Sequence, residues 1–390
     1  MPRWNKIYAL AIIAMLYLAA YVSLHDTYNI IALYAVLPFA FALTFFQSGT
    51  INVNRCFTTL MILYLWVAFT TLFSTDVAVS VRQLKQIVGC IFVSYIVAVQ
   101  ARNEKTVPWL YVVYVIIYAV SVDYAVNNIM SDIEIGEERV DDDKLNANTL
   151  AYYTFYTTFI VFLFGEIIQR KWVSRIFRTL FFGVIPLSLW IAYITASRQV
   201  LIIQIPLIAL LLIMRYWSFG GKLSKVFIVL LLVGLTPVLI EYITPIFNDS
   251  LLLERAEDIG DDSRLRLVGE TLDVALSNPI VGVGPGCVRL YLSDGVFSHN
   301  TFLELFAGTG FIGMLIFIIL LWRFFSDQIK RYAETHDRMY LYFLIFGIFF
   351  VVDQVFFVFY QSLYLISFLV LVASHSDTHY QNSRRLLNQV

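Results

Sequence analysis

The chain has 390 residues, of which 59% are hydrophobic and 14% are charged, and its mean hydropathy is +0.75. Because soluble domains are about half apolar and about a quarter charged, this composition excludes an ordinary aqueous globule. The formal net charge is -1 and no basic stripe interleaved with aromatic residues occurs, which argues against a nucleic-acid partner. The three cysteines, Cys56, Cys90 and Cys287, lack the paired spacing of a disulfide framework or a thiolate metal site.

Apolar stretches of about 16 to 21 residues recur along the chain, each close to the length that a helix needs to cross about 30 Å of hydrocarbon. They run roughly over residues 6–24, 28–46, 56–73, 84–101, 107–127, 147–166, 176–195, 199–216, 225–245, 301–322, 338–358 and 359–374. The sequence therefore predicts an all-α integral membrane protein with about twelve transmembrane helices. Residues 6–24 could also be a signal peptide, but the next apolar stretch follows so soon that we expect a retained first helix.

The distribution of cations predicts the orientation of these helices. With the N-terminus in the cytoplasm, 18 of the 27 lysines and arginines fall in cytoplasmic segments, and both termini are cytoplasmic. The nine cations on the outer side are Arg82, Lys85, Arg139, Lys144, Arg198, Arg255, Arg264, Arg266 and Arg289. Most of them are arginines, whose planar guanidinium suits phosphate and carboxylate groups. They either bind an anionic ligand or pair with acids of the outer segments, and the sequence leaves both interpretations open.

Along the chain, the prediction divides into four segments. Residues 1–127 form N-terminal transmembrane helices, 128–245 central transmembrane helices with an acidic outer loop, 246–299 a periplasmic loop, and 300–390 C-terminal transmembrane helices with a cytoplasmic tail. The acidic loop contains Asp141, Asp142 and Asp143. Because a consecutive acidic run is usually a solvated loop, we expect no metal site there.

The periplasmic loop is the one sizeable soluble piece of the predicted protein. Between Leu252 and Leu276, charged and apolar residues alternate at helical spacing, which predicts an amphipathic helix. Its expected apolar stripe consists of Leu265, Val268, Leu272, Ala275 and Leu276. We expect this helix to lie on the membrane or to cap a cavity.

His299 is the most informative titratable residue, because it can exchange a proton near neutral pH where the periplasmic loop enters a membrane helix. Asn300 follows it, and Glu304 lies one turn further on the same helix face. The glycines of the preceding segment 278–286 would let backbone approach a bulky ligand. The glycines at 308, 310 and 313 favour close helix packing. A histidine at a helix start is otherwise a cap or an interfacial residue.

Four motifs in this order resemble the O-antigen ligase and polymerase superfamily of bacterial membranes. The first two are the run Asn146-Ala147-Asn148-Thr149-Leu150-Ala151 and the turn Thr195-Ala196-Ser197-Arg198. The third is the segment from Arg264 through Asn278-Pro279 and Gly282-Val283-Gly284 to Glu304. The fourth is His299-Asn300, nine residues, Gly310, two residues and Gly313. The R-x10-G pattern of some polymerases is not found, which leaves the subfamily open.

This resemblance implies a GT-C-like, metal-independent and cofactor-independent glycosyltransferase that inverts the anomeric centre at the periplasmic face of the bacterial inner membrane. Its donor would be a saccharide on undecaprenyl diphosphate, and its acceptor a growing glycan or the lipid A core, among membrane lipids. By motif position, His299 is the catalytic candidate, and Arg198, Arg264 and Arg266 are the diphosphate-binding candidates. The residues Arg139, Asn148, Asn300 and Glu304 complete the predicted substrate site. Whether a partner protein regulates chain length stays open.

Three other functions compete with this interpretation. A transporter or lipid flippase would share the twelve-helix layout, but Asp353 is the clearest intramembrane acid and no paired broken helices are apparent. Asp353 would then pair with an arginine or hydrogen bond between helices. A purely structural subunit would not need the outer arginines. Between polymerase and ligase, the modest periplasmic loop slightly favours a polymerase of O-antigen or capsule, because it offers little surface for a fixed lipid A core.

Overall fold

The computed structural model of the chain describes residues 32–48, 53–116, 119, 147–168, 170–194, 198–217, 263–358, 360 and 362–387. Within these residues all regular secondary structure is helical, as the composition and periodicity predict. The chain divides into two compact units, which we describe separately. Unit 1 comprises residues 1–117 and 263–390, and unit 2 comprises residues 118–262. Unit 1 therefore joins the N-terminal helices to the C-terminal ones.

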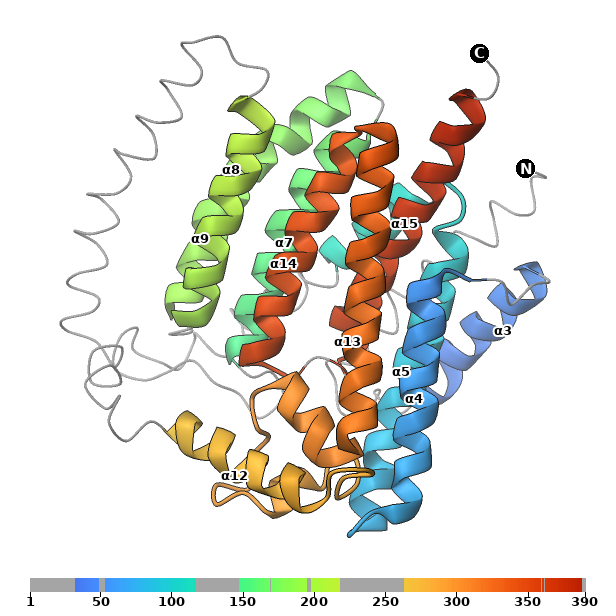
Figure 1. Ribbon diagram of the computed structural model, residues 1–390. Coiled ribbons are helices and arrows are strands. Elements are labelled where there is room, and N and C mark those ends of the chain that lie inside the picture. Colours follow the sequence, from blue (N-terminus) through green and yellow to red (C-terminus); the bar gives the residue numbers. More distant parts are fainter. Residues whose placement is uncertain are drawn as a thin grey trace, which may run out of the picture. The chain divides into compact units, whose positions relative to one another are not determined.

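Unit 1 is a helical bundle with a compact cap at one end (Figure 1). Its helices are η1 (Ala32–Val36), α3 (Leu37–Ser48), α4 (Arg55–Thr70), η2 (Thr71–Phe73), α5 (Val77–Gln100), α12 (Ser263–Ser277), η5 (Val288–Leu290), α13 (Thr301–Thr335), α14 (Arg338–Phe356) and α15 (Leu363–Leu387), with a further helix over residues 107–116. Helix α13 packs against α4, α12 and α14, while α5 packs against α3 and α15. The cap consists of α12 and the loop between α12 and α13.

Unit 2 contains α7 (Ala147–Ile167), α8 (Lys171–Ile194), α9 (Arg198–Leu212) and η3 (Ile213–Trp217). Its apolar helices bury a polar cluster in which the Gln204 amide donates to the hydroxyls of Thr158 and Ser188. At one end of the unit, the Glu166 carboxylate accepts ion pairs from Arg178 at 3.2 Å and Arg215 at 3.0 Å. These contacts tie α8 and η3 to α7.

Five described helices are long and apolar enough to cross a membrane. They are Arg55–Phe73, Val77–Gln100, Lys171–Ala192, Thr301–Thr335 and Arg338–Phe356. Each overlaps a stretch predicted from the sequence, so the membrane character is confirmed. The remaining predicted stretches include 6–24 and 225–245, which lie outside the described residues, so the total of twelve and the positions of both termini stay predictions.

Two helices extend well beyond the apolar stretches that predicted them. Helix α13 continues to Thr335 rather than ending near residue 322, and α15 continues to Leu387 rather than ending near residue 374. The polar extension of α13 carries i,i+4 ion pairs, Asp327 with Arg331 and Lys330 with Glu334, which support a helix outside the apolar segment. Hydropathy alone therefore ended both helices too early.

The two ends of unit 1 carry different cations. One end holds cations predicted to be cytoplasmic, and the other holds cations predicted to be on the outer side. The end formed by residues 323–338 and 374–384 holds Arg323, Arg331 and Arg338, all predicted to be cytoplasmic. The cap at the other end holds Arg266 and Arg289, both predicted to be on the outer side. We call these the inner end and the outer end of unit 1. The separation agrees with the predicted orientation, which itself stays a prediction.

Candidate functional site at the outer end of unit 1

The outer end is built around an interruption of helix α13 at Gly310, whose backbone angles are φ 75° and ψ 177°. This conformation frees the carbonyl groups before the break, and the neighbouring chain satisfies them. Val283 and Gly284 donate their backbone N–H groups to the carbonyls of Ala307 and Gly308, each at 2.9 Å. The Trp66 indole donates to the carbonyl of Thr309 at 2.8 Å. The loop over residues 278–286 is thus bonded into the break in the helix.

Glycine is required where this loop meets the helix. A Cβ atom on Gly310 would lie 1.9 Å from the carbonyl oxygen of Ile280, and one on Gly282 would lie 2.4 Å from the carbonyl carbon of Gly308. Both residues also have positive φ angles, which favour glycine. The expectation that the glycines of 278–286 bring backbone toward a ligand is therefore wrong for Gly282, which brings it toward α13.

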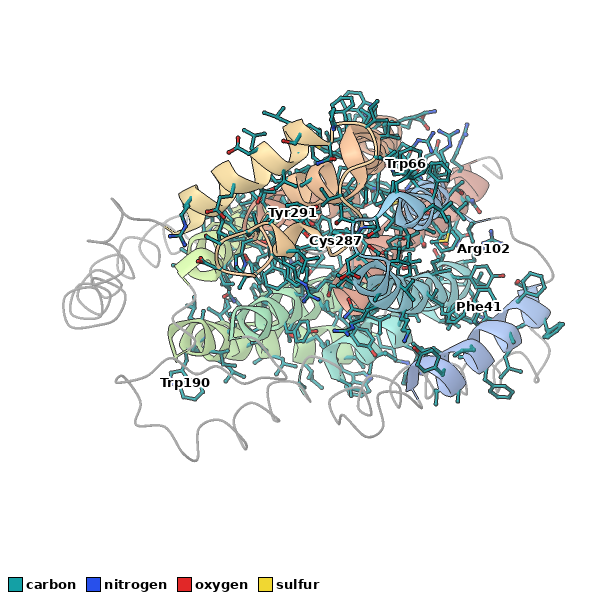
Figure 2. The ribbon with its side chains drawn as sticks, turned by 90° about the horizontal axis from the view of Figure 1, so that it is seen from below. Phe41, Trp66, Arg102, Trp190, Cys287 and Tyr291 are labelled. Carbon is teal, nitrogen blue, oxygen red and sulfur yellow. The ribbon has the colours of Figure 1, made fainter. Side chains whose placement is uncertain are left out.

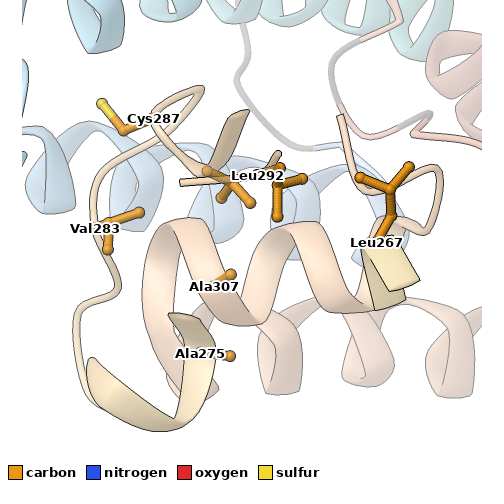
Figure 3. Packing of buried hydrophobic residues seen from close by; sticks show 7 residues of the cluster. Leu267, Ala275, Val283, Cys287, Leu292 and Ala307 are labelled. Carbon is orange, nitrogen blue, oxygen red and sulfur yellow. The ribbon is translucent and has the colours of Figure 1, made fainter. Parts of the chain in front are cut away.

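A small apolar core holds the cap together (Figure 3). It consists of Leu267, Ala275, Val283, Cys287, Val288, Leu292 and Ala307. The core joins α12, the loop and the first turns of α13 (Figure 3). Seen from below, Cys287 and Tyr291 belong to the loop and Trp66 to α4 (Figure 2). The core thus holds the loop against α12 and α13, directly before the residues that lead into α13.

The buried face of α12 differs from the predicted stripe. Leu267, Thr271 and Ala275 are buried at i, i+4 and i+8, whereas Leu272 is 40% and Leu276 61% exposed. Thr271 can be buried because its hydroxyl donates to the carbonyl of Leu267 at 2.6 Å. Of the predicted stripe, only Ala275 lies on the buried face among the residues whose side chains are described, so the leucines form a second, outward apolar face.

The start of α13 presents the two titratable residues of the predicted site. Asn300 caps the helix: its Oδ1 accepts the N–H groups of Phe302 at 2.9 Å and Leu303 at 3.0 Å. His299 precedes it, half-buried, with a left-handed backbone at φ 53° that costs about 1 kcal/mol in an L-residue. The cap fixes the direction in which the chain enters the helix and so fixes the backbone of His299. The Asn300 side chain thus bonds the backbone of the first turn of α13.

Glu304 is buried one turn into α13, with 1% of its surface exposed. Its Oε2 accepts the backbone N–H of Ser298 at 3.2 Å, while its Oε1 has no hydrogen-bond donor within the described part of the chain. This bond joins the carboxylate to the residue directly before His299. The Glu304 N–H also donates to the carbonyl of Asn300 at 2.9 Å, which agrees with the prediction that Glu304 lies one turn after Asn300 on the same helix face.

The first residue of α13 also connects this site to α14. The Thr301 hydroxyl lies 2.9 Å from the Gln354 Oε1 and 2.7 Å from the carbonyl oxygen of Phe357. Asp353, the intramembrane acid of the transporter alternative, is fully buried beside Gln354 on α14. The break in α13 is a broken helix, which the sequence did not suggest, but protein groups from the loop fill it.

Three outer arginines of unit 1 have described side chains: Arg82 on α5 is exposed, while Arg266 and Arg289 lie in the cap and differ from each other. Arg266 binds both carboxylate oxygens of Asp294, at 2.7 and 2.8 Å, and lies 3.6 Å from Glu270. Arg266 therefore fits the alternative in which the outer arginines pair with acids of the outer segments. Arg289 has no ion-pair partner within 4.0 Å in the described ranges. The predicted residues Arg139 and the side chains of Asn148, Arg198 and Arg264 lie outside what the structure describes, as does the acidic run at 141–143.

Residues 182–318, about a third of the 390-residue chain, match the family model described as O-antigen ligase. The match ends in α13 just beyond Gly313, so it contains the His299 motif, the loop and the helix break. The resemblance inferred from the motifs is thereby confirmed over these residues, which are similar to the O-antigen ligase family. No curated protein matches the chain significantly.

Sequence reasoning missed Arg289 as a candidate, although it counted this residue among the nine outer cations. The available signal was its position ten residues before His299, on the same outer segment. It also missed the break at Gly310, because a helix with positive φ at one glycine has the same hydropathy as a continuous helix. The motif glycines were the only sign of it in the sequence.

Proposed function

We propose that the protein is a membrane glycosyltransferase that moves a saccharide from undecaprenyl diphosphate to a sugar hydroxyl at the periplasmic face of the inner membrane, in the assembly of a surface polysaccharide. The observation that carries this proposal is the rigid mounting of His299 within the O-antigen ligase domain. A capped helix start, a filled helix break and a packed loop fix the backbone on either side of a half-buried imidazole. Such rigidity suits a group that must meet a substrate in one orientation.

The chemistry needs a proton acceptor and stabilisation of negative charge. The acceptor hydroxyl attacks the anomeric carbon of the donor, the bond from that carbon to the phosphate oxygen breaks, and the electron pair leaves with undecaprenyl diphosphate. Neutral His299 takes the hydroxyl proton or orients the hydroxyl, which is typically worth about 10²- to 10⁴-fold in rate. Attack opposite the leaving group inverts the anomeric centre. Arginines supply charge-assisted bonds to the phosphates, so this reaction requires no metal.

The two candidate activities, polymerase and ligase, differ in their acceptor. The description of the matching family favours a ligase that attaches polymer to lipid A core. The short segment between α12 and α13, residues 278–300, favours a polymerase, because it offers a small surface for a large fixed acceptor. We retain the polymerase as the first candidate. Deletion of the gene decides between them: single units on the lipid anchor indicate a polymerase, and free long polymer indicates a ligase.

The proposal is tested with the purified full-length protein in nanodiscs, an undecaprenyl-diphosphate-linked labelled oligosaccharide, and a glycan acceptor. We expect His299→Ala to bind the donor but to transfer at least about 100-fold more slowly than the native protein. Lys330→Ala, which changes a side chain that is 73% exposed at the inner end, serves as the control and should transfer normally. Equal transfer by His299→Ala and the native protein would remove His299 from the mechanism. Transport of the labelled lipid without any transfer would favour a flippase instead.

A further inference from the structure

Arg289 is a cation held at the outer end without a carboxylate of its own. No acidic oxygen of the described chain lies within 4.0 Å of its guanidinium, and its side chain is half-buried rather than extended into solvent. Arg266, its neighbour in the cap, is held by Asp294 and Glu270. An arginine that is partly desolvated and lacks an anion is expected to bind one, because removing its charge from water is costly.

The position of Arg289 is fixed by its surroundings. The residue lies in η5, whose Val288 is fully buried in the apolar core of the cap. Its guanidinium carbon lies 5.8 Å from the centre of the Phe297 ring, a cation–π distance. Phe297 is two residues before His299, so this contact places the cation beside the histidine segment.

Glu304 adds a second observation at the same place. Its carboxylate is 99% removed from solvent, since only 1% of the residue is exposed, yet Oε1 has no donor among the described groups. The Glu304 Oε2 accepts the backbone N–H of Ser298, which lies between Phe297 and His299. The carboxylate thus holds the segment whose Phe297 ring contacts the Arg289 guanidinium.

We infer that Arg289 contacts the diphosphate of the lipid-linked donor and that Glu304 is a positioning residue, which holds the Phe297–His299 segment against Arg289 through its bond to the Ser298 N–H. This inference rests on the proposed function and adds a residue to it. The phosphates supply the anion that Arg289 lacks, and the charge-assisted bonds strengthen as negative charge develops on the leaving diphosphate. No bond to the protein forms, and the acceptor proton still goes to His299.

The inference is tested by measuring the affinity of the purified full-length protein for undecaprenyl diphosphate without a sugar and, as a second probe, for undecaprenol, which has no phosphate. Arg289→Gln removes the charge and keeps a polar side chain. We expect it to weaken binding of undecaprenyl diphosphate by about tenfold to a hundredfold and to leave undecaprenol binding unchanged. Lys330→Gln, which also removes a cation but at the inner end where the side chain is 73% exposed, is the control, and we expect less than about a twofold change.

Glu304→Gln tests the positioning role. The measurement compares its effect on diphosphate affinity in the native background and in Arg289→Gln, a difference that general destabilisation would not produce. We expect this substitution to weaken diphosphate binding by about threefold in the native background and to have no further effect in Arg289→Gln, because the two residues act as one unit. Unchanged diphosphate affinity in Arg289→Gln, or equal losses for both lipids, would overturn the inference. If His299→Ala still abolished transfer in that case, the proposed function would stand without Arg289. If the native protein bound no undecaprenyl diphosphate, both would fail.

Discussion

The inner and outer ends of unit 1 treat their buried polar groups differently. At the inner end, charged residues meet partners: Arg331 binds Ser376 and Asp377, and His379 lies 2.7 Å from Asp337. At the outer end, Glu304 keeps a buried oxygen without a donor, and Arg289 has no carboxylate partner in the described chain. A left-handed residue other than glycine occurs at each end, His299 at the outer end and His336 at the inner end.

This difference separates groups that stabilise the fold from groups that await a ligand. A paired buried charge holds helices together, whereas an unpaired one reduces stability unless a substrate completes it. The Tyr340 hydroxyl at the inner end also lacks a described partner, but it is neutral and its burial costs less than that of a carboxylate. This comparison supports the proposal that the outer end binds the substrate, and it is the reason to expect structural support from the inner end.

The largest effect is expected at the helix break. Gly310→Ala places a Cβ atom 1.9 Å from the Ile280 carbonyl oxygen and forces an L-residue to φ 75°, so we expect a loss of about 3 kcal/mol or more of unfolding free energy. Thermal unfolding of the purified protein in detergent measures it.

Gly269→Ala provides the matched control, because a Cβ atom there meets nothing within 4 Å in an exposed turn of α12. We expect it to be neutral or to stabilise the protein by about 0.5 to 1 kcal/mol. Equal stability of Gly310→Ala and the native protein would show that the loop is not bonded into the break as described.

The next effect contrasts one carboxylate from each end. Asp377→Asn removes one of the two carboxylates that pair with the buried Arg331, the other being Asp327, and we expect it to destabilise the protein by about 1.5 kcal/mol while transfer per folded molecule stays normal. Glu304→Gln should do the opposite, with an unchanged or higher unfolding temperature and transfer about tenfold slower. Thermal unfolding and the reconstituted transfer assay give both values. A loss of transfer in Asp377→Asn with normal transfer in Glu304→Gln would reverse the assignment of the two ends.

The smallest effect concerns pH at the inner end, outside the membrane-spanning segments. The hydrogen bond from His379 lowers the pKa of Asp337, assisted by the backbone N–H of Met339. A lowered pKa in the folded state stabilises the protein above the unfolded pKa of about 3.9. This stabilisation is lost as the pH falls through the folded value.

Because the Asp337 side chain is 38% exposed, screening limits the contribution to about 0.5 kcal/mol. Unfolding temperatures measured between pH 6 and pH 3 should fall less steeply for Asp337→Asn than for the native protein. Parallel curves for the two proteins would assign the pH dependence to other groups.

Hydropathy and charge predicted the membrane character, the approximate positions of the described spans and the separation of Arg266 from Arg331. They did not predict the ends of α13 and α15, because ion pairs such as Asp327 with Arg331 extend a helix without adding hydropathy. They also misplaced the buried face of α12, since a threonine that bonds its own helix can be buried where a leucine was expected.

For the site, the motifs identified His299, directly before the cap of α13, and Glu304, in its first turn. They could not rank the arginines, because whether Arg266 or Arg289 is paired depends on Asp294 and Glu270, which only the folded loop brings into contact. The roles of Gly282 and Gly310 were equally hidden, since a glycine in the sequence does not reveal whether it approaches a ligand or another helix.

The most direct test of the assignment of the outer end is photocrosslinking of the full-length protein with undecaprenyl diphosphate that carries a photoreactive group next to the diphosphate. We expect labelled peptides from residues 263–304, with labelling reduced in Arg289→Gln. Labelling confined to the inner end, residues 323–338 or 374–384, would contradict the central claim that the outer end of unit 1 binds the lipid-linked donor.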